Sequence, residues 1–185
     1  QVDKEWLEIA AHPKKEWTDG CSANVALMTS QKIKGQNILK LITCNLGDSV
    51  LILCGRDGKA QRLTDPLTLK NTKERMRVSE ALGGDKNLEF EQAPDTKLLT
   101  TSVNKEKLDI KFTRCFGARP FKLMKSKYIT ATPVIKTHLL TDAPVFAILV
   151  SSSISQVLRD QEIVDLCLNN FDDDATTAAK KVSRE

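Results

Sequence analysis

The sequence predicts an α+β fold. Short runs rich in isoleucine, valine and leucine, separated by glycine turns, occupy residues 23–54 and are typical of antiparallel strands. Segments with helical spacing and capping residues follow at 72–82 and near the end of the chain. Hydrophobic residues make up 41% and charged residues 28% of the 185 residues, which is typical of a globular protein rather than a disordered one. This length suits a single domain spanning residues 1–185.

The first part of the chain is expected to form one helix and then three strands. Residues Asp3 to Ala11 have helical spacing of apolar side chains, and Pro13 ends the pattern. The turns of an antiparallel meander are expected at Gly35, Gly47 and Asp57-Gly58. The predicted strands are Ala23–Thr29, Ile38–Asn45 and Val50–Cys54.

The middle of the chain predicts a helix with well-marked ends. Asn71 can cap a helix over Thr72–Leu82, Glu74 stands at the capping-box position, and Gly83-Gly84 supplies a left-handed stop. The polar stretch Asp85 to Asp95 is expected to be a loop or a weak edge element.

The last third predicts two strands and two helices. The strands are Ala131–Leu140 and Val145–Val150, and the second is apolar enough to be buried on both faces. The helices are Gln161–Phe171 and Ala175 to about Ser183, the second capped by Asp174. One apolar stripe of the last helix requires a sheet or helix to cover it, and it consists of Ala175, Ala178, Ala179 and Val182.

Five segments, taken in order, resemble the PPM family of metal-dependent phosphatases, the type 2C serine/threonine phosphatases. The most specific contains a Gly-Asp-Ser turn and an Asp-Gly-Lys hairpin. The five segments are Asp19–Leu27, Leu41–Thr64, Asn71–Gly84, Ile110–Lys122 and Phe146–Leu166. The resemblance implies an α-β-β-α sandwich of two stacked antiparallel sheets flanked by helices. It also implies a domain incomplete at both ends, because the family's N-terminal Asp-Gly-His-Gly motif and C-terminal Ser-Asp-Asn motif are not in the sequence.

The same resemblance implies that the metal ligands of the family are lost. The family holds two or more Mg²⁺ or Mn²⁺ ions, and such cations prefer carboxylate oxygens. Ser152 stands at a metal-binding Asp position, Gln156 at a second Asp, and Ala118 at the Asp of the Arg-x-x-Gly-Asp turn. Asp48 alone remains as a candidate for a residual metal ligand. The alternative is that Asp48 is a turn residue whose side chain forms hydrogen bonds with nearby backbone groups. We therefore predict no catalytic residues, no metal site and no cofactor.

One basic segment is a candidate surface for a partner. Its six cations are Lys111, Arg114, Arg119, Lys122, Lys125 and Lys127, with no acidic residue among them. Phe112, Phe116, Phe121 and Tyr128 are interleaved with these cations. The segment could bind a phosphorylated peptide, an acidic protein or an RNA backbone. The alternative is a solvated loop whose aromatic side chains enter the core.

The cysteines and histidines indicate neither a disulfide framework nor a metal site. The five cysteines are widely spaced without a C-x-x-C pair, and His12 and His138 lack the spacing of metal ligands. We expect an intracellular, reducing compartment, with the cytoplasm favoured. The longest apolar run, Pro144 to Val150, is too short to span a bilayer, so no membrane association is expected. The net charge of +4 does not by itself indicate nucleic acid.

The sequence therefore favours a catalytically inactive phosphatase-like domain that acts as a binding, regulatory or structural scaffold. Its expected partners are proteins, and no small-molecule substrate is expected. One alternative is an active phosphatase whose remaining ligands lie outside this sequence. A second is a nucleic-acid-associated structural subunit that uses the basic segment 111–127.

Overall fold

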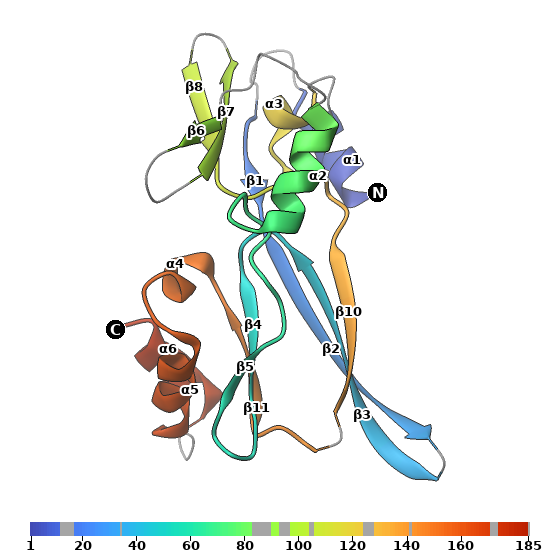
Figure 1. The fold of residues 1–185 in the computed structure, drawn as a ribbon, viewed down its shortest axis with the longest axis vertical. Helices are drawn as coiled ribbons and strands as arrows, with labels where there is room; N and C mark the ends of the chain where they lie inside the picture. Colours follow the sequence, from blue (N-terminus) through green and yellow to red (C-terminus); the bar gives the residue numbers. More distant parts are fainter. Residues whose placement is uncertain are drawn as a thin grey trace. The chain divides into compact units, whose positions relative to one another are not determined.

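The chain folds as an α+β protein, as the sequence predicts (Figure 1). The computed structural model describes residues 1–11, 17–33, 35–82, 90–92, 97–103, 106–123, 128–140, 142–170 and 174–184. The helices are α1 (Val2–Ile9), α2 (Thr72–Leu82), α3 (Arg119–Lys122), α4 (Ser152–Ser155), α5 (Asp160–Leu168) and α6 (Ala175–Val182). The strands are β1 (Gly20–Cys21), β2 (Ala23–Ile33), β3 (Gln36–Leu46), β4 (Val50–Cys54), β5 (Ala60–Arg62), β6 (Phe90–Gln92), β7 (Lys97–Val103), β8 (Glu106–Ile110), β9 (Phe116–Gly117), β10 (Val134–Leu140) and β11 (Phe146–Val150).

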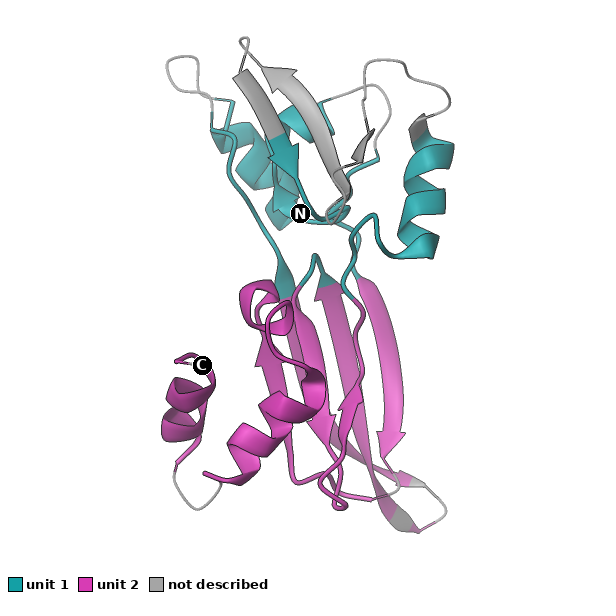
Figure 2. Ribbon diagram, turned by 60° about the vertical axis from the view of Figure 1, so that its left-hand side comes forward, with its two compact units in different colours: residues 1–23, 46–48, 66–133 teal, residues 24–45, 49–65, 134–185 magenta. Residues whose placement is uncertain are grey.

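Two compact units, each assembled from three stretches of sequence, make up the chain (Figure 2). The first unit comprises Gln1–Ala23, Leu46–Asp48 and Pro66–Pro133. The second unit comprises Asn24–Asn45, Ser49–Asp65 and Val134–Glu185. The expectation of a single domain stays a prediction.

The second unit contains the two stacked antiparallel sheets that the sequence implies. One sheet has the strand order β10-β3-β2 and the other has the order β11-β4-β5. Strand β10 runs antiparallel to β3, and β4 is antiparallel to both of its neighbours. The two sheets meet through a cluster of buried leucines from β3, from β4 and from the residue after β5, namely Leu41, Leu51, Leu53 and Leu63.

Helix α5 covers the outer face of the sheet that contains β4. Val50, Ile52 and Cys54 alternate along β4 and pack against Ile163 and Val164 of the helix. The predicted helix Gln161–Phe171 starts one residue later than the observed α5 and extends beyond its observed end at Leu168, since Asn169 and Asn170 form a turn. Phe171 itself lies outside the described residues.

The expected meander from β2 through β4 is wrong, because β3 and β4 belong to different sheets. The chain leaves the first sheet at Gly47, whose φ of +106° lies in the left-handed region that glycine tolerates. The Gly47 carbonyl accepts a hydrogen bond from the backbone N–H of Leu67 at 2.8 Å, which holds this turn. Apolar alternation is the same in a meander and in a sandwich, so the sequence pattern did not separate the two arrangements.

The expectation that β11 is buried on both faces is also wrong. Ala147 and Leu149 are exposed, whereas Phe146 and Ile148 are half-buried. The physical reason is that β11 has β4 as its single neighbour among the described strands. A strand of five apolar residues therefore lies at the edge of its sheet.

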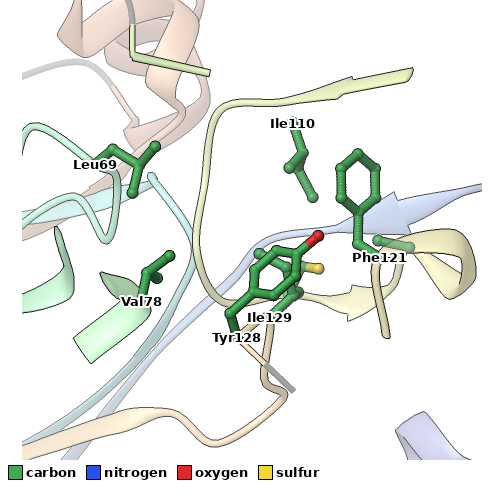
Figure 3. Packing of buried hydrophobic residues seen from close by; sticks show 8 residues of the cluster. Leu69, Val78, Ile110, Phe121, Tyr128 and Ile129 are labelled. Atoms are coloured by element: carbon green, nitrogen blue, oxygen red, sulfur yellow. The ribbon is translucent and has the colours of Figure 1, made fainter. Parts of the chain in front are cut away.

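The first unit is built around α2 and a cluster of eight buried residues (Figure 3). Asn71 caps α2 as predicted, because its side-chain oxygen accepts a hydrogen bond from the backbone N–H of Lys73 at 3.0 Å. The cluster contains Leu69, Val78, Ile110, Cys115, Ala118, Phe121, Tyr128 and Ile129. Phe121 of the basic segment and Tyr128, the residue directly after it, are thus core residues.

A three-stranded sheet of the first unit was only partly predicted. Its order is β6-β7-β8, and both pairs are antiparallel. Strand β6 lies at the edge, in the stretch predicted as a loop or weak edge element, while the sequence pattern predicted neither β7 nor β8. Gly83-Gly84, the predicted stop of α2, lies outside the described residues. None of the helices in the described part of the chain is long and apolar enough to cross a membrane.

Candidate functional site

Asp48, the residual metal-ligand candidate, lies in the turn between β3 and β4. It belongs to the first unit and is 7% exposed. The preceding Gly47 has no room for a side chain, since a Cβ atom there would lie 2.3 Å from the Cβ atom of Ser22. Local packing therefore requires glycine before Asp48, and the turn keeps its shape for steric reasons.

Ser152, which the sequence predicts to stand at the position of a metal ligand, is the first residue of the short helix α4 in the second unit. The side-chain hydroxyls of Ser151 and Ser153 lie 3.0 Å apart and share a hydrogen bond. The hydroxyl of Ser155 donates a hydrogen bond to the Ser152 carbonyl at 3.4 Å, and Gln156 ends the helix. The segment 151–156 thus offers hydroxyl and amide groups and no carboxylate.

Ala118, which the sequence resemblance places at an Asp position of the family, has a left-handed backbone conformation. Its φ of 52° and ψ of 47° are left-handed, and alanine in this region is strained, whereas asparagine and aspartate enter it more readily. Its backbone N–H donates to the Asp19 carbonyl at 2.7 Å. The turn therefore has a shape suited to aspartate, although it carries no carboxylate.

These donor groups do not fit a pair of divalent cations. The positions that the sequence resemblance assigns to the metal site offer one carboxylate at Asp48, a hydroxyl at Ser152, an amide at Gln156 and a methyl group at Ala118. Hard cations prefer several carboxylate or carbonyl oxygens. Within the described residues, no group of three or more His, Cys, Asp or Glu side chains could hold a metal ion.

A buried electrostatic cluster of the first unit lies around Glu74 on α2. The Glu74 side chain is buried, and its carboxylate accepts hydrogen bonds from two arginines and a threonine. The Arg114 guanidinium donates from Nη2 at 2.7 Å and from Nε at 3.0 Å, while Arg77 donates from Nη2 at 2.9 Å. The Thr113 hydroxyl donates at 2.6 Å.

These contacts keep Glu74 ionised. Burial acts to raise the pKa of the Glu74 carboxyl, but hydrogen bonds from Arg114, Arg77 and Thr113 outweigh it and lower the pKa to about 2. The expected capping box forms only in part: the Glu74 N–H donates to the Asn71 side-chain oxygen at 3.4 Å, but the Glu74 carboxylate turns to the two guanidinium groups rather than to the start of the helix. Charge-assisted hydrogen bonds between two ions are stronger than the bond that a capping box provides.

Arg114 and Lys122, two of the six basic candidates, form ion pairs within the fold. Arg114 pairs with Glu74 and also donates to the Thr132 carbonyl at 2.8 Å. The Lys122 side chain is 7% exposed, and its ammonium donates to Asp3 at 2.5 Å and to the Cys115 carbonyl at 2.7 Å.

The other four basic candidates differ in their exposure to solvent, and two of them are not described. Lys111 is exposed, and Arg119 is half-buried on α3 with an internal interaction of its own. Lys125 and Lys127 lie outside the described residues. Partner binding by this segment remains a prediction, and Lys111 is its exposed cation among the residues that the structure describes.

The Glu74 cluster and the contact between Asp3 and Lys122 were missed by sequence reasoning. Asp3 on α1 also accepts a hydrogen bond from the backbone N–H of Gly117 at 2.8 Å, so it attaches α1 to β9. The spacing of Glu74 and Arg77 along a helix was a usable signal for one ion pair. No local pattern connects Glu74 to Arg114 or Asp3 to Lys122.

The thiols are free, and the buried ones are poor nucleophiles. All five cysteines are unpaired. Burial raises the pKa of Cys115 to about 12 and raises the pKa of both Cys54 and Cys167 above the ordinary value. His138 is half-buried on β10, and His12 lies outside the described residues.

Comparisons with known proteins agree with this fold. The sequence profile described as Protein phosphatase 2C matches residues 2–185. The structure is similar to serine-threonine phosphatase 2C from Toxoplasma gondii, with a TM-score of 0.64 and 14% identity over 98% of this chain and 59% of that one. It also resembles a phosphatase from Toxoplasma gondii, with a TM-score of 0.60 and 19% identity over 86% of this chain and 53% of that one. A phosphatase from a pathogenic strain of Toxoplasma gondii has a TM-score of 0.60 and 15% identity over 89% of this chain and 57% of that one.

The chain spans between 53% and 59% of the length of these solved phosphatases. At sequence identities of 14% to 19%, the similarity shows a shared fold and no more than that. No curated protein sequence matches the chain significantly. The profile match covers nearly every residue, and the two stacked antiparallel sheets are those expected of such a domain. The chain therefore belongs to the protein phosphatase 2C family.

Proposed function

We propose that this chain is a catalytically inactive phosphatase 2C-like domain that works as a binding, regulatory or structural scaffold. The observation that carries the proposal is Ser152 at the start of α4, where the family has a metal-binding Asp. A neutral hydroxyl supplies neither the charge nor the bridging geometry of a carboxylate.

The neighbouring residues support this proposal. The hydroxyls of Ser151 and Ser153 bond to each other, and Ala118 holds a left-handed turn without a carboxylate. A single acid at Asp48 does not offset the dehydration of a hard dication. Residues that hydrogen-bond to metal ligands only orient those ligands, so they cannot compensate for a ligand that is missing.

The proposed partners of this scaffold are proteins. The proposed location is a reducing intracellular compartment such as the cytoplasm. The five free thiols, three of them buried, support this compartment. The internal pairing of Arg114 and Lys122 leaves less of segment 111–127 available to a nucleic-acid backbone. This supports a protein partner over the nucleic-acid alternative.

Activity measurements test the proposal. With excess Mn²⁺, the chain is expected to hydrolyse neither p-nitrophenyl phosphate nor a phosphothreonine peptide above a blank without protein. Any turnover observed is compared with that of Asp48→Ala purified in the same way, because a contaminating phosphatase would be present in both preparations. Activity that disappears in Asp48→Ala would overturn the proposal and establish the domain as an enzyme.

A further inference from the structure

Three exposed lysines of the first unit come from two segments that are far apart in the sequence. Lys70 directly precedes the residue that caps α2, Lys73 lies in the first turn of that helix, and Lys111 follows β8. All three belong to the first unit and are exposed to solvent. Hydrated lysine side chains require no cover from another part of the fold, unlike an exposed apolar face.

Printed contacts of the backbone and of α2 bring these two segments together. Phe112, the neighbour of Lys111, forms an antiparallel bridge with Thr68. The backbone N–H of Lys70 donates to the hydroxyl of Thr68 at 3.3 Å. The Glu74 carboxylate of α2 also accepts hydrogen bonds from the two residues that follow Phe112. The lysines therefore lie around one region of the first unit.

These lysines have no acidic partner in the part of the chain that the structure describes. None of the ion pairs there involves them. Glu74, the acid in the first turn of α2, is buried and already binds two guanidinium groups. Asp109, two residues before Lys111, has an interaction of its own. By contrast, the exposed Lys59 of the second unit pairs with Asp57 at 3.4 Å.

Two of the lysines stand at an unfavourable position for α2. The N-terminus of a helix carries a partial positive charge, so cations in or just before the first turn destabilise it. The Asn71 side-chain oxygen accepts hydrogen bonds from the N–H groups of Lys73 at 3.0 Å and of Glu74 at 3.4 Å. A bound anion would therefore contact the lysine ammonium groups rather than these N–H groups. Local conflicts of this kind are expected at functional sites.

We propose that Lys70, Lys73 and Lys111 bind an acidic segment of a partner protein, a run of aspartates or glutamates. The proposal rests on the proposed scaffold function and names one of its interaction surfaces. Lysine ammonium groups are point charges that bind carboxylates from several directions. Arg77 and Arg114, whose planar groups would suit a phosphate, are engaged by the buried carboxylate of α2. A series of carboxylates therefore fits this surface better than one phosphate group.

Nucleic acid is a poorer fit for the same lysines. Proteins that bind single strands combine cations with aromatic side chains on which the bases stack. Phe112 is half-buried and packs against the core of the first unit, while Phe121 and Tyr128 are buried within that core. These aromatic side chains near Lys111 therefore offer little surface for stacking.

The probe for this site is octaglutamate labelled with rhodamine, and octaglutamine with the same label is the uncharged control peptide. The 185-residue chain is titrated into each peptide, and binding is followed by fluorescence anisotropy. We expect saturable binding of octaglutamate at about 50 mM NaCl and binding at least about fivefold weaker at about 300 mM, because salt screens exposed charges. Octaglutamine should not bind.

Two triple variants locate the site while removing the same number of charges. The test variant carries Lys70→Gln, Lys73→Gln and Lys111→Gln. The control variant removes three exposed cations elsewhere, through Lys4→Gln, Arg75→Gln and Lys180→Gln. The test variant should bind octaglutamate at least about tenfold more weakly, and the control variant should bind it as the unaltered chain does. Far-UV circular dichroism confirms that both variants are folded.

The outcomes are distinct. Absence of saturable binding, binding of octaglutamine, or equal weakening in the two triple variants would overturn the proposal. A labelled octauridylate is titrated in parallel, and tighter binding of this RNA through the same lysines would identify nucleic acid as the ligand and also overturn it. Weakening confined to the test variant supports it. The phosphatase assay decides the scaffold proposal separately, since neither triple variant alters Asp48 or Ser152.

Discussion

At the scale of single residues, the buried Glu74 connects several segments of the first unit. Its buried carboxylate is held by Arg114 and Arg77, and each guanidinium also donates to a backbone carbonyl, Thr132 for Arg114 and Tyr128 for Arg77. One carboxylate thus connects α2 to two distant chain segments. Buried ion pairs add little compared with apolar packing, but removal of one partner leaves an uncompensated charge in the interior.

Glu74→Gln is therefore expected to lower the free energy of unfolding at pH 7 by roughly 3 kcal/mol, because Arg114, whose side chain is 14% exposed, would lose its counter-charge. Urea titration at pH 7 measures the change. Glu80→Gln, on the exposed side of the same helix, is the control and should shift stability by less than about 0.5 kcal/mol. Equal effects of the two substitutions would contradict the role given to Glu74.

The same variant shows a specific dependence on pH. The folded-state pKa of Glu74 is lowered from 4.5 to about 2, so its stabilisation is fully present above pH 4.5 and is lost as the pH falls toward 2. The wild type should therefore lose stability more steeply than Glu74→Gln in this window, by on the order of 3 kcal/mol. Parallel curves for the two proteins between about pH 5 and about pH 2 would show that Glu74 is not the group responsible.

At the scale of secondary-structure elements, the turn at Gly47 decides that β3 and β4 enter different sheets. Two separate constraints act there: a positive φ of 106°, and the 2.3 Å that would separate a Cβ atom at this position from the Cβ atom of Ser22. Gly35, in the turn between β2 and β3, has a positive φ of 84° but no atom within 4 Å of its Cβ position. The two glycines therefore form a matched pair.

Gly35→Ala should cost about 1–2 kcal/mol from the left-handed backbone alone. Gly47→Ala should cost clearly more, because the backbone near Ser22 must also shift. Thermal and urea unfolding of the two variants measure the difference. If the two substitutions had the same effect, steric contact at Gly47 would not be what holds the turn.

At the scale of the whole molecule, the two units have separate cores but interleaved sequences. The chain passes repeatedly between them, and neither unit is a continuous stretch that could fold by itself. Ile129 is buried in the core of the first unit, and Ile163 is buried in the core of the second. Shared connectivity predicts that both cores unfold in one cooperative transition.

Ile129→Ala and Ile163→Ala should each lower the free energy of unfolding by about 2–5 kcal/mol, and both should shift the same single transition. Tryptophan fluorescence reports on the first unit, which contains Trp6 and Trp17, and far-UV circular dichroism reports on the whole chain. Transitions that separate between the two probes would show independently unfolding units and contradict the single-domain prediction.

The sequence pattern correctly predicted those elements that are determined by interactions between residues close together in the chain. Strand β4 and helix α2 have the predicted bounds, and the caps at Asn71 and Asp174 are those expected. Apolar alternation and capping chemistry act within a few residues, so they can be read locally. The family resemblance and the absence of carboxylates at positions 118 and 152 were likewise visible in the sequence alone.

The tertiary structure alone decided which sheet each strand joins, where the sheet containing β11 ends, and which cations are already paired. Arg114 looks like an available surface charge in the sequence but is paired with the buried Glu74, 40 residues earlier in the chain. Strand β11 looks like a central strand but borders an apolar groove. Each of these features depends on contacts between residues far apart in the sequence, and the period of a local pattern carries no information about such partners.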